Sequence, residues 1–376
     1  MPESSRARNT TSPAELDPKE RVRELAQAHG FDECRIARAA PAAHAEAYQE
    51  WLAEGRHGDL DWMARDPKRR SDPRLVFPAA KSVIVLATNY FQGRAPNPEF
   101  KIARYAWGDD YHDLVKKRLK AMARDLESLG GQQRVYCDTG PILERDFANE
   151  AGLGWSGKST LQLHRRLGTW FFLSEILTSL ELAPDSPERN KCGKCTACIT
   201  ACPTGAITEP HKLDARRCLS YFTIEHKGPI PEEFRRAMGD RIYGCDDCLT
   251  ACPWNRFAQA SREASLQARE YVHDWKLRDF LALSDAEFRT LFRKSPIKRT
   301  KRSRFLRNVC VALGNTGRAQ DLPALERAAA EPDPLIAEHA RWAIQEIQNR
   351  CSDSSSHTKL QNSLEEWREG GVEKRR

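Results

Sequence analysis

The chain has 376 residues, a formal net charge of +7 at pH 7, and hydrophobic residues at 40% of its positions. This length predicts two or three domains, which is more than a small electron carrier needs. No apolar run approaches the roughly 18 residues of a membrane span, and the first residues lack the twin arginines and apolar stretch of an export signal. We therefore expect a cytoplasmic protein without a membrane partner.

The first part of the chain alternates helix-like and strand-like segments. Residues 1–18 are polar, and we expect them to be disordered. The next segments in chain order are a helix from Pro18 ended by Gly30, a strand in DECRIARAA, a helical stretch over 44–65 and a buried strand in KSVIVLATNYF. They are followed by a helix in DLVKKRLKAMARDLESLGG, a strand in QQRVYCDTGP and a helix in RDFANEAGLG. The last segment, GTWFFLSEILTSLEL, is predicted to be a strand or a buried helix. This alternation predicts an α/β core domain over residues 19–184.

Residues 185–260 carry eight of the twelve cysteines: two runs of four and three that each end in C-P, and Cys218 between the runs. The spacing C-x-x-C-x-x-C-x-x-x-C-P is that of bacterial two-cluster ferredoxins, in which the fourth cysteine ligates the other cluster. A ferredoxin-like domain is therefore predicted, with Cys192, Cys195, Cys198 and Cys252 on cluster 1 and Cys202, Cys218, Cys245 and Cys248 on cluster 2. Structural zinc is the alternative for paired C-x-x-C motifs, and disulfides are disfavoured in a reducing compartment. The expected cofactors are two [4Fe-4S] clusters.

The last part of the chain predicts helical repeats. RFLRNVCVALGNTGRAQDLPALERAAAEPDPLIAEHARWAIQEIQ contains two helix pairs of roughly 30 residues, as in a short α-solenoid of the HEAT type. Two repeats are too few to stand alone, so we expect them to pack on the cluster domain. Residues 261–350 are assigned to a basic segment with this HEAT-like repeat, and residues 351–376 to a disordered tail.

Eight lysines and arginines lie between Arg293 and Arg307. From charge alone, a solvated basic face and a nucleic-acid contact explain this run equally well. Its position beside helical repeats, which present concave surfaces, favours contact with an RNA phosphate backbone. The RNA-binding candidates are Lys298, Arg299, Lys301, Arg302 and Arg304.

Further motifs stand beside the cysteine runs and the terminal HEAT-like pair: the carrying segments are VYCDTGPILERDFANEAGLGWSGKSTL, CGKCTACITACPTGAI, RRCLSYFTIEHKG and YGCDDCLTACPWN. Taken together, in order from about residue 18 to residue 350, these motifs resemble the epoxyqueuosine reductases of tRNA queuosine biosynthesis. It implies that the α/β domain binds cobalamin and that the enzyme reduces epoxyqueuosine to queuosine at the wobble position of a tRNA anticodon stem-loop. The reaction takes up two electrons and two protons and releases water, so an electron donor, still unidentified, must dock. Nothing demands more than a monomer.

The resemblance also implies roles for single residues. Asp138 would be the general acid that protonates the departing oxygen, and the implied cobalamin contacts are Arg70, Asp138, Thr139 and Lys158. Ser220 and Asp246 stand beside the predicted ligands Cys218 and Cys245, close enough to a cluster to contact the edge of a corrin. Independently, Asp138 ends a predicted strand, where α/β folds place ligands, and burial against the corrin would raise its pKa enough for proton donation near neutral pH. The alternatives are an Asx-turn for Asp138 and an ordinary surface arginine for Arg70.

Some members of the family carry a cysteine near the cobalamin, in the segment matching IARYAWGDDYH, whereas Ala103 stands there in this chain. A cysteine at that place is therefore not part of the mechanism here. Two other functions explain the cysteine runs. A reductive dehalogenase also pairs a corrinoid with two clusters, but it typically carries an export signal and lacks a basic segment before helical repeats. A non-catalytic electron-transfer module would leave the α/β domain without a purpose.

Overall fold

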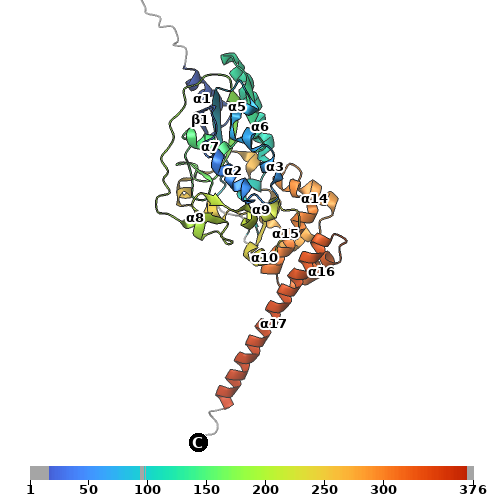
Figure 1. Cartoon of the computed structure of the whole chain (residues 1–376). Helices are drawn as coiled ribbons and strands as arrows, with labels where there is room; N and C mark the ends of the chain where they lie inside the picture. The colour runs from blue at the N-terminus through green and yellow to red at the C-terminus, as the bar shows by residue number, and fades with distance from the viewer. Residues whose placement is uncertain (1–16, 94–96, 98, 371–376) are drawn as a thin grey trace, which may run out of the picture.

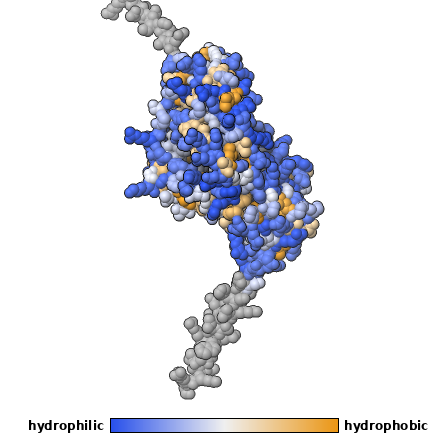
Figure 2. Space-filling view, in the orientation of Figure 1, coloured by the Kyte–Doolittle hydropathy of each residue, from blue (hydrophilic) through white to orange (hydrophobic). Residues whose placement is uncertain are grey.

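The computed structural model describes residues 17–93, 97 and 99–370 (Figure 1). The expected disordered segment 1–18 therefore lies outside the described residues except for Asp17, which caps the first helix, and Pro18, which begins it. Among the described residues, none of the helices has the length and apolar composition of a membrane span. The face seen in Figure 2 is mostly hydrophilic, with apolar residues in small groups.

A four-stranded sheet with the order β1-β2-β7-β4 forms the centre of the N-terminal part, and all its neighbouring strands are antiparallel. Its strands are β1 (Glu33–Arg38), β2 (Ser82–Asn89), β4 (Gln133–Tyr136) and β7 (Phe171–Thr178). Helices α1 (Pro18–Ala28) and α6 (Tyr111–Leu126) pack on one face, and α7 (Glu144–Glu150) packs on the other. The expected mixed α/β architecture is confirmed, although alternating helices and strands more often build a parallel sheet.

The side chains of β2 explain why this strand is buried along its whole length. Ile84 and Leu86 join the core under α1 and α6, whereas Val83 and Val85 join the core under α7. Successive residues of a strand point to opposite faces, so a continuous apolar run fits a strand that is covered on both sides. The segment GTWFFLSEILTSLEL, a strand or a helix from its sequence, forms the strand β7.

Short elements connect the strands of this sheet. They are α2 (Ala45–Ala53), α3 (Asp61–Ala64), α4 (Pro67–Ser71), α5 (Pro73–Val76), η1 (Arg104–Ala106), η2 (Glu127–Leu129), β5 (Trp155–Ser156) and β6 (Gln162–Leu163). The helical stretch expected over 44–65 is two helices, because Gly55 and Gly58 take positive φ angles of 64° and 56° between them. Such angles suit glycine and interrupt a helix.

The cysteine-bearing segment is made of short elements. They are α8 (Ala197–Thr200), β8 (Ile207–Glu209), β9 (Lys212–Leu213), η3 (Ala215–Arg217), α9 (Leu219–Ile224), α10 (Glu232–Met238), β10 (Arg241–Tyr243), α11 (Asp247–Thr250) and η4 (Pro253–Phe257). Each cysteine run contains a one-turn helix, and these two helices, α8 and α11, contact each other. β10 pairs in parallel with β3 (Lys101–Ile102), so the first part of the chain reaches into this segment.

The C-terminal part is helical. Its elements are η5 (Ala264–Leu266), α12 (Glu270–Asp274), α13 (Leu277–Leu281), α14 (Asp285–Leu291), η6 (Pro296–Thr300), α15 (Lys301–Thr316), η7 (Ala319–Asp321), α16 (Leu322–Ala329) and α17 (Pro334–Gly370). Both α15 and α16 pack on α17, so the region expected as two helix pairs contains three α-helices. Residues 351–370, expected to belong to a disordered tail, continue α17 (Figure 1). No proline follows Pro334, which begins α17, so no residue locks the backbone against this helix.

Two buried polar side chains of α15 join the helical part to the cysteine-bearing segment. Arg307 donates hydrogen bonds to the carbonyls of Phe222, His226 and Gly228. Asn308 donates to the carbonyls of Thr223 and Ile242, at 2.8 and 3.0 Å, and accepts from Arg307. Both side chains are fully buried, so every one of these bonds replaces one that water would otherwise make.

Replacing Asn308 by alanine should therefore weaken this joint. The change leaves two buried carbonyls and part of the Arg307 guanidinium without partners, which costs about 3 kcal/mol of unfolding free energy. Urea unfolding of the anaerobic protein, followed by circular dichroism, measures the loss. Asn349→Ala makes the same substitution at an exposed position of α17 and should leave the midpoint unchanged. Equal midpoints for both variants would contradict a structural role for Asn308.

Candidate active site

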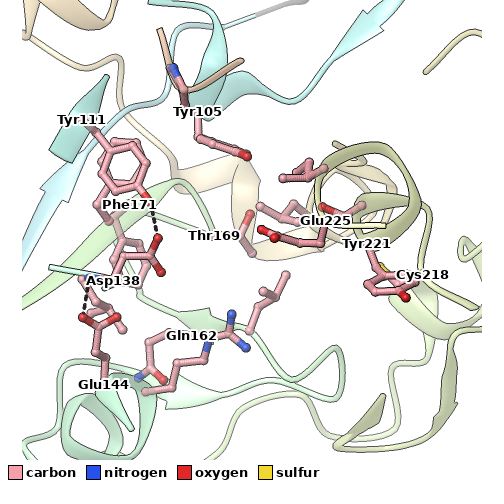
Figure 3. A pocket seen from close by; sticks show the side chains of 18 of the residues that line it. Tyr105, Tyr111, Asp138, Glu144, Gln162, Thr169, Phe171, Cys218, Tyr221 and Glu225 are labelled. Atoms are coloured by element: carbon pink, nitrogen blue, oxygen red, sulfur yellow. Dashed lines mark hydrogen bonds between the residues drawn. The ribbon is translucent and has the colours of Figure 1, made fainter. Parts of the chain in front are cut away.

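A cavity of about 460 Å³ lies where the three parts of the chain meet (Figure 3). The sheet domain contributes Tyr111, His112, Asp138, Glu144, Phe171 and Phe172; the cysteine-bearing segment contributes Leu213, Cys218, Ser220, Tyr221 and Leu249; the C-terminal part contributes Pro296 and Arg299. Aromatic and aliphatic side chains make up most of this lining. A few polar groups converge on a largely apolar space, which is the usual character of a ligand site.

Asp138 stands on one wall of the cavity, and Cys218 stands on the other side (Figure 3). Asp138 lies two residues after the end of β4, in a left-handed backbone conformation with φ of 58°. Its backbone N–H donates to Glu144 Oε1 at 2.6 Å, and the Arg70 guanidinium donates to the carbonyl of Gly140 at 2.9 Å. These bonds hold the turn in a conformation that costs energy for a residue with a Cβ atom. The turn therefore fixes where the carboxyl of Asp138 points.

The Asp138 carboxyl is held as a carboxylate. Its Oδ2 accepts from the Tyr111 hydroxyl at 2.6 Å and lies 3.3 Å from Nε2 of His112. Burial raises the pKa of Asp138, but the hydrogen bonds from His112 and Tyr111 and the charge of His112 outweigh burial and lower the pKa to about 2. This is the reverse of the raised pKa that we expected for a proton donor. The sequence argument considered burial alone and had no sign of the two donors.

Two further carboxyl groups, those of Glu144 and Glu175, lie near Asp138. Glu175 on β7 is fully buried, and Glu144 lies between it and Asp138. Burial, and for each carboxyl the charge of its neighbours, raise the pKa of both Glu144 and Glu175. Two neighbouring carboxylates repel each other, so ionising both costs free energy. The pair formed by Glu144 and Glu175 therefore retains a proton near neutral pH. A protonated pair avoids adding negative charge beside Asp138.

The predicted ligands of cluster 1 lie near one another. Burial and then the charges of Cys192, Cys198 and Cys195 raise the pKa of Cys252 to about 11, although a backbone hydrogen bond opposes them. Thiolates that interact in this way repel one another, and iron cations would relieve the repulsion. The donor set thus fits a cluster. Within the described residues, no group of three or more His, Cys, Asp or Glu side chains is already arranged to hold a metal ion.

The predicted ligands of cluster 2 form a separate group beside the cavity. Burial and the charges of Cys218, Cys245 and Cys202 raise the pKa of Cys248 well above its usual value. Cys218 itself lines the cavity, and so does Leu249, the neighbour of Cys248 in the sequence. A cluster on these thiols would adjoin whatever occupies the cavity. The assignment of each thiol to its cluster stays a prediction.

The other predicted cobalamin contacts are spread around the cavity. Ser220 lines it, and Thr139 is the exposed neighbour of Asp138. Arg70 holds the Gly140 carbonyl, as described above, and its guanidinium lies 5.3 Å from the centre of the Trp62 ring, which also lines the cavity. Lys158 is directed elsewhere, because its Nζ donates to the carbonyls of Gly193 and Cys195 at 2.7 and 2.9 Å.

Asp246 is also outside the cavity lining. Its carboxylate accepts from the backbone N–H of Arg104 at 2.7 Å, and burial raises its pKa to about 6 against the opposing effect of Arg104. Ala103, which precedes Arg104 in the chain, is buried. Its N–H donates to the carbonyl of Tyr243, and its methyl group fills the space beside Gly244. Neither residue faces the cavity.

The structure separates the five RNA-binding candidates by environment. Lys298 and Lys301 are exposed. Arg302 pairs with both carboxylate oxygens of Glu331, and Arg304 donates to backbone carbonyls, including that of Glu225. The guanidinium groups of Arg302 and Arg304 therefore bind partners within the protein.

Arg299, the fifth candidate, pairs with Glu225 and lines the cavity. Sequence reasoning therefore missed Arg299 as a cavity residue, together with Tyr111 and His112. The only sequence signal for the last two was the Asp110 N-cap at the start of a helix, which does not reveal what the helix faces.

Comparisons with known proteins agree with this geometry. Family models match at residues 191–255, as a 4Fe-4S double cluster binding domain, and at residues 70–139, as epoxyqueuosine reductase QueG. The epoxyqueuosine reductase of Xanthomonas campestris is 41% identical over 345 residues, which cover 88% of this chain and 97% of that protein. That of Escherichia coli is 44% identical over 313 residues, which cover 80% of this chain and 82% of that protein.

Solved structures show the same relationship. The crystal structure of an epoxyqueuosine reductase with an epoxyqueuosine-modified tRNA stem loop has a TM-score of 0.82 and 31% identity, and the match covers 88% of this chain and 90% of that one. The epoxyqueuosine reductase of Streptococcus thermophilus has a TM-score of 0.80 and 28% identity, with the same coverage. The chain thus contains a double [4Fe-4S] cluster domain, and it belongs to the epoxyqueuosine reductase family.

Proposed function

We propose that this protein reduces epoxyqueuosine to queuosine in the anticodon stem-loop of tRNA, using two [4Fe-4S] clusters and cobalamin. The observation that carries the proposal is the cavity itself, which has the Asp138 carboxyl on one side and the Cys218 thiol on the other (Figure 3). An epoxide reduction needs a proton source and an electron source at the same place. Relatives with this activity in their names match nearly the whole chain.

The cavity suits a flat cofactor. Iron–sulfur clusters pass single electrons, so a cofactor that bonds to carbon is required between the clusters and an epoxide, and cobalamin supplies that chemistry. The apolar lining, including Leu213, Tyr221 and Leu249 on the side of the cysteines, fits the faces of a corrin. Ser220 on the same side and Arg70 beside Trp62 would meet its polar edge. Thr139, Lys158 and Asp246 remain weaker proposals, because other contacts engage them or they lie outside the lining.

The residues opposite the cysteines would handle the substrate. Asp138 is fixed by its turn and reaches the cavity, so it is the group that delivers a proton to the oxygen that leaves carbon. The Tyr111 hydroxyl orients the Asp138 carboxylate. Phe171 and Phe172 form an apolar wall that excludes water from the reacting atoms.

The tRNA would reach the cavity past the C-terminal part, which we propose to be a short HEAT-like repeat made of α15, α16 and α17. Lys298 and Lys301 are exposed beside this repeat and can neutralise backbone phosphates. Such contacts give salt-dependent affinity and little sequence specificity. Arg299 faces the cavity, where a guanidinium would meet the nucleotide that enters.

The deciding experiment is anaerobic. Protein reconstituted with iron and sulfide is incubated with cobalamin, dithionite and an anticodon stem-loop that carries epoxyqueuosine, and the nucleosides are analysed by mass spectrometry. We expect the modified base to lose one oxygen atom, and only when cobalamin is present. A protein that carries both clusters and retains cobalamin but leaves the base unchanged would overturn the proposal. Failure to retain cobalamin would favour an electron-transfer module.

A further inference from the structure

Three side chains form a line that leads to the proposed proton donor: Asp110, His112 and Asp138. Asp110 caps α6, and its Oδ1 accepts from the backbone N–H of His112 at 3.0 Å and lies 2.8 Å from Nδ1 of the same residue. The other ring nitrogen, Nε2, lies 3.3 Å from Oδ2 of Asp138. This contact is an ion pair: Nε2 is buried, and within the described residues it has no well-aligned hydrogen-bond partner. The imidazole therefore bridges two carboxyl groups.

The chemistry of Asp110 determines where the protons of this imidazole are. An ionised carboxylate only accepts hydrogen bonds, so Nδ1 carries a hydrogen and donates it to Asp110. Nε2 then carries a hydrogen only when the ring is cationic. A hydrogen on Nε2 lies beside Asp138, whose Oδ2 is 3.3 Å from Nε2, and Asp138 is the group that must receive a proton before each proton donation. The geometry supplies a donor at the place where the reaction needs a proton.

The charges around the imidazole favour the cationic ring. Burial lowers the pKa of His112, but the hydrogen bonds and charges of Asp110 and Asp138 outweigh it and raise the pKa to about 9. The other polar groups near it are Tyr111, whose ring stacks on it at 4.1 Å, and Arg299, which acts on both carboxylates. Near neutral pH the proton thus resides on His112, and Asp138 is a carboxylate. Asp138 alone would have nothing to give.

We propose that His112 supplies the proton that Asp138 delivers, with Asp110 as the residue that positions His112. This inference rests on the proposed epoxide reduction. In the proposed transfer the Nε2–H bond of His112 breaks and an O–H bond forms on Asp138. Asp138 passes its proton to the epoxide oxygen as the carbon–oxygen bond breaks; the two electrons would come from the proposed clusters and cobalamin.

His112 is left neutral by this transfer and takes a new proton from water. The side chain of His112 is 15% exposed and its Nε2 is buried, whereas the side chain of the adjoining Asp138 is 49% exposed, so water reaches the pair at the Asp138 carboxyl. The same path can then deliver the second proton, which converts the departing hydroxyl into water. The two protons and two electrons of the overall reaction are thus accounted for.

Two measurements test the relay, and the first requires no turnover. In protein labelled at histidine ¹³Cε1, His112→Gln identifies the His112 signal, and we expect that signal to titrate near pH 9 rather than at the usual value of about 6.5. Asp138→Asn should move the titration to lower pH, because the ring loses one of its two carboxylates. A His112 signal that titrates near 6.5 in the unsubstituted protein would overturn the proposal.

The second measurement is the single-turnover rate as a function of pH. The unsubstituted protein should lose rate as the pH rises through about 9, where His112 loses its proton. His112→Gln should lower the rate about 10- to 100-fold and remove that fall. Asp110→Asn, which keeps a good helix cap, should shift the fall to lower pH. His273→Gln, at an exposed histidine, should change neither rate nor profile.

An unchanged rate and profile in His112→Gln, with both clusters loaded, would also overturn the relay. If the unsubstituted protein leaves epoxyqueuosine unreduced, the proposed function fails, and the relay to an epoxide fails with it. The NMR titration then still shows whether the His112 and Asp138 pair holds a proton. Asp110→Asn keeps the test decisive if His112→Gln does not fold, because its effect on the pH profile is predicted independently.

Discussion

Replacing Asp138 by asparagine should lower the single-turnover rate of epoxyqueuosine reduction about 100- to 10,000-fold, the usual contribution of a general acid. The amide occupies the same volume and still accepts a hydrogen bond from Tyr111, so the turn after β4 is expected to stay in place. It cannot receive a proton from His112 and pass it on. Nucleoside mass spectrometry after rapid quenching measures the rate, and iron content and retained cobalamin are measured on the same sample.

The matched control for this variant is Asp274→Asn, at an exposed position at the end of α12. It removes the same charge outside the cavity lining and should react at the unsubstituted rate. The variant at Asp138 should keep both clusters and the proposed cobalamin, because Cys218, the cysteine that lines the cavity, lies on the other side of it (Figure 3). A fully loaded Asp138→Asn protein that reacts at the unsubstituted rate would remove Asp138 from the mechanism.

How far the sequence predicts this molecule depends on the range of the interactions. Local patterns were sufficient for β2, whose apolar run fits a strand covered on both faces, and for α1, which begins at a capped proline and ends before Gly30. The spacing of the cysteines is equally local, because short loops must surround a cluster. These features are fixed by residues close together in the chain.

The polar side of the cavity depends on contacts between distant segments. His112 on α6 meets Asp138 after β4, and Arg299 reaches the same cavity from the C-terminal part. Their pairing is a product of the antiparallel sheet and of the joint made by α15, which local patterns do not specify. The density of basic residues in the sequence likewise made both Arg299 and Arg302 RNA-binding candidates. In the structure Arg302 pairs with Glu331, whereas Arg299 lines the cavity. The contacts with His112 and Tyr111 that lower the pKa of Asp138 also join distant segments.

The assignment of cysteines to clusters can be tested by combining substitutions. Cys248 belongs to the short helix α11, and Cys252 follows two residues after its end. The charges of Cys192, Cys195 and Cys198 nevertheless act on Cys252, whereas those of Cys202, Cys218 and Cys245 act on Cys248. Each single alanine variant should lose one cluster, which reduces the iron content from about eight to about four atoms per chain. Either loss breaks the electron route and should abolish turnover.

Pairs of substitutions then separate the crossed assignment from a simple one. Cys192→Ala combined with Cys252→Ala should lose no more iron than either change alone, because both thiols serve cluster 1. Cys248→Ala combined with Cys252→Ala should lose nearly all the iron, although these residues are much closer in sequence. If each cysteine run instead held its own cluster, the two pairs would give the opposite results. Iron analysis of these single and double variants therefore determines whether the chain crosses between clusters, an arrangement that ties α8 to α11 and holds cluster 2 against the cavity.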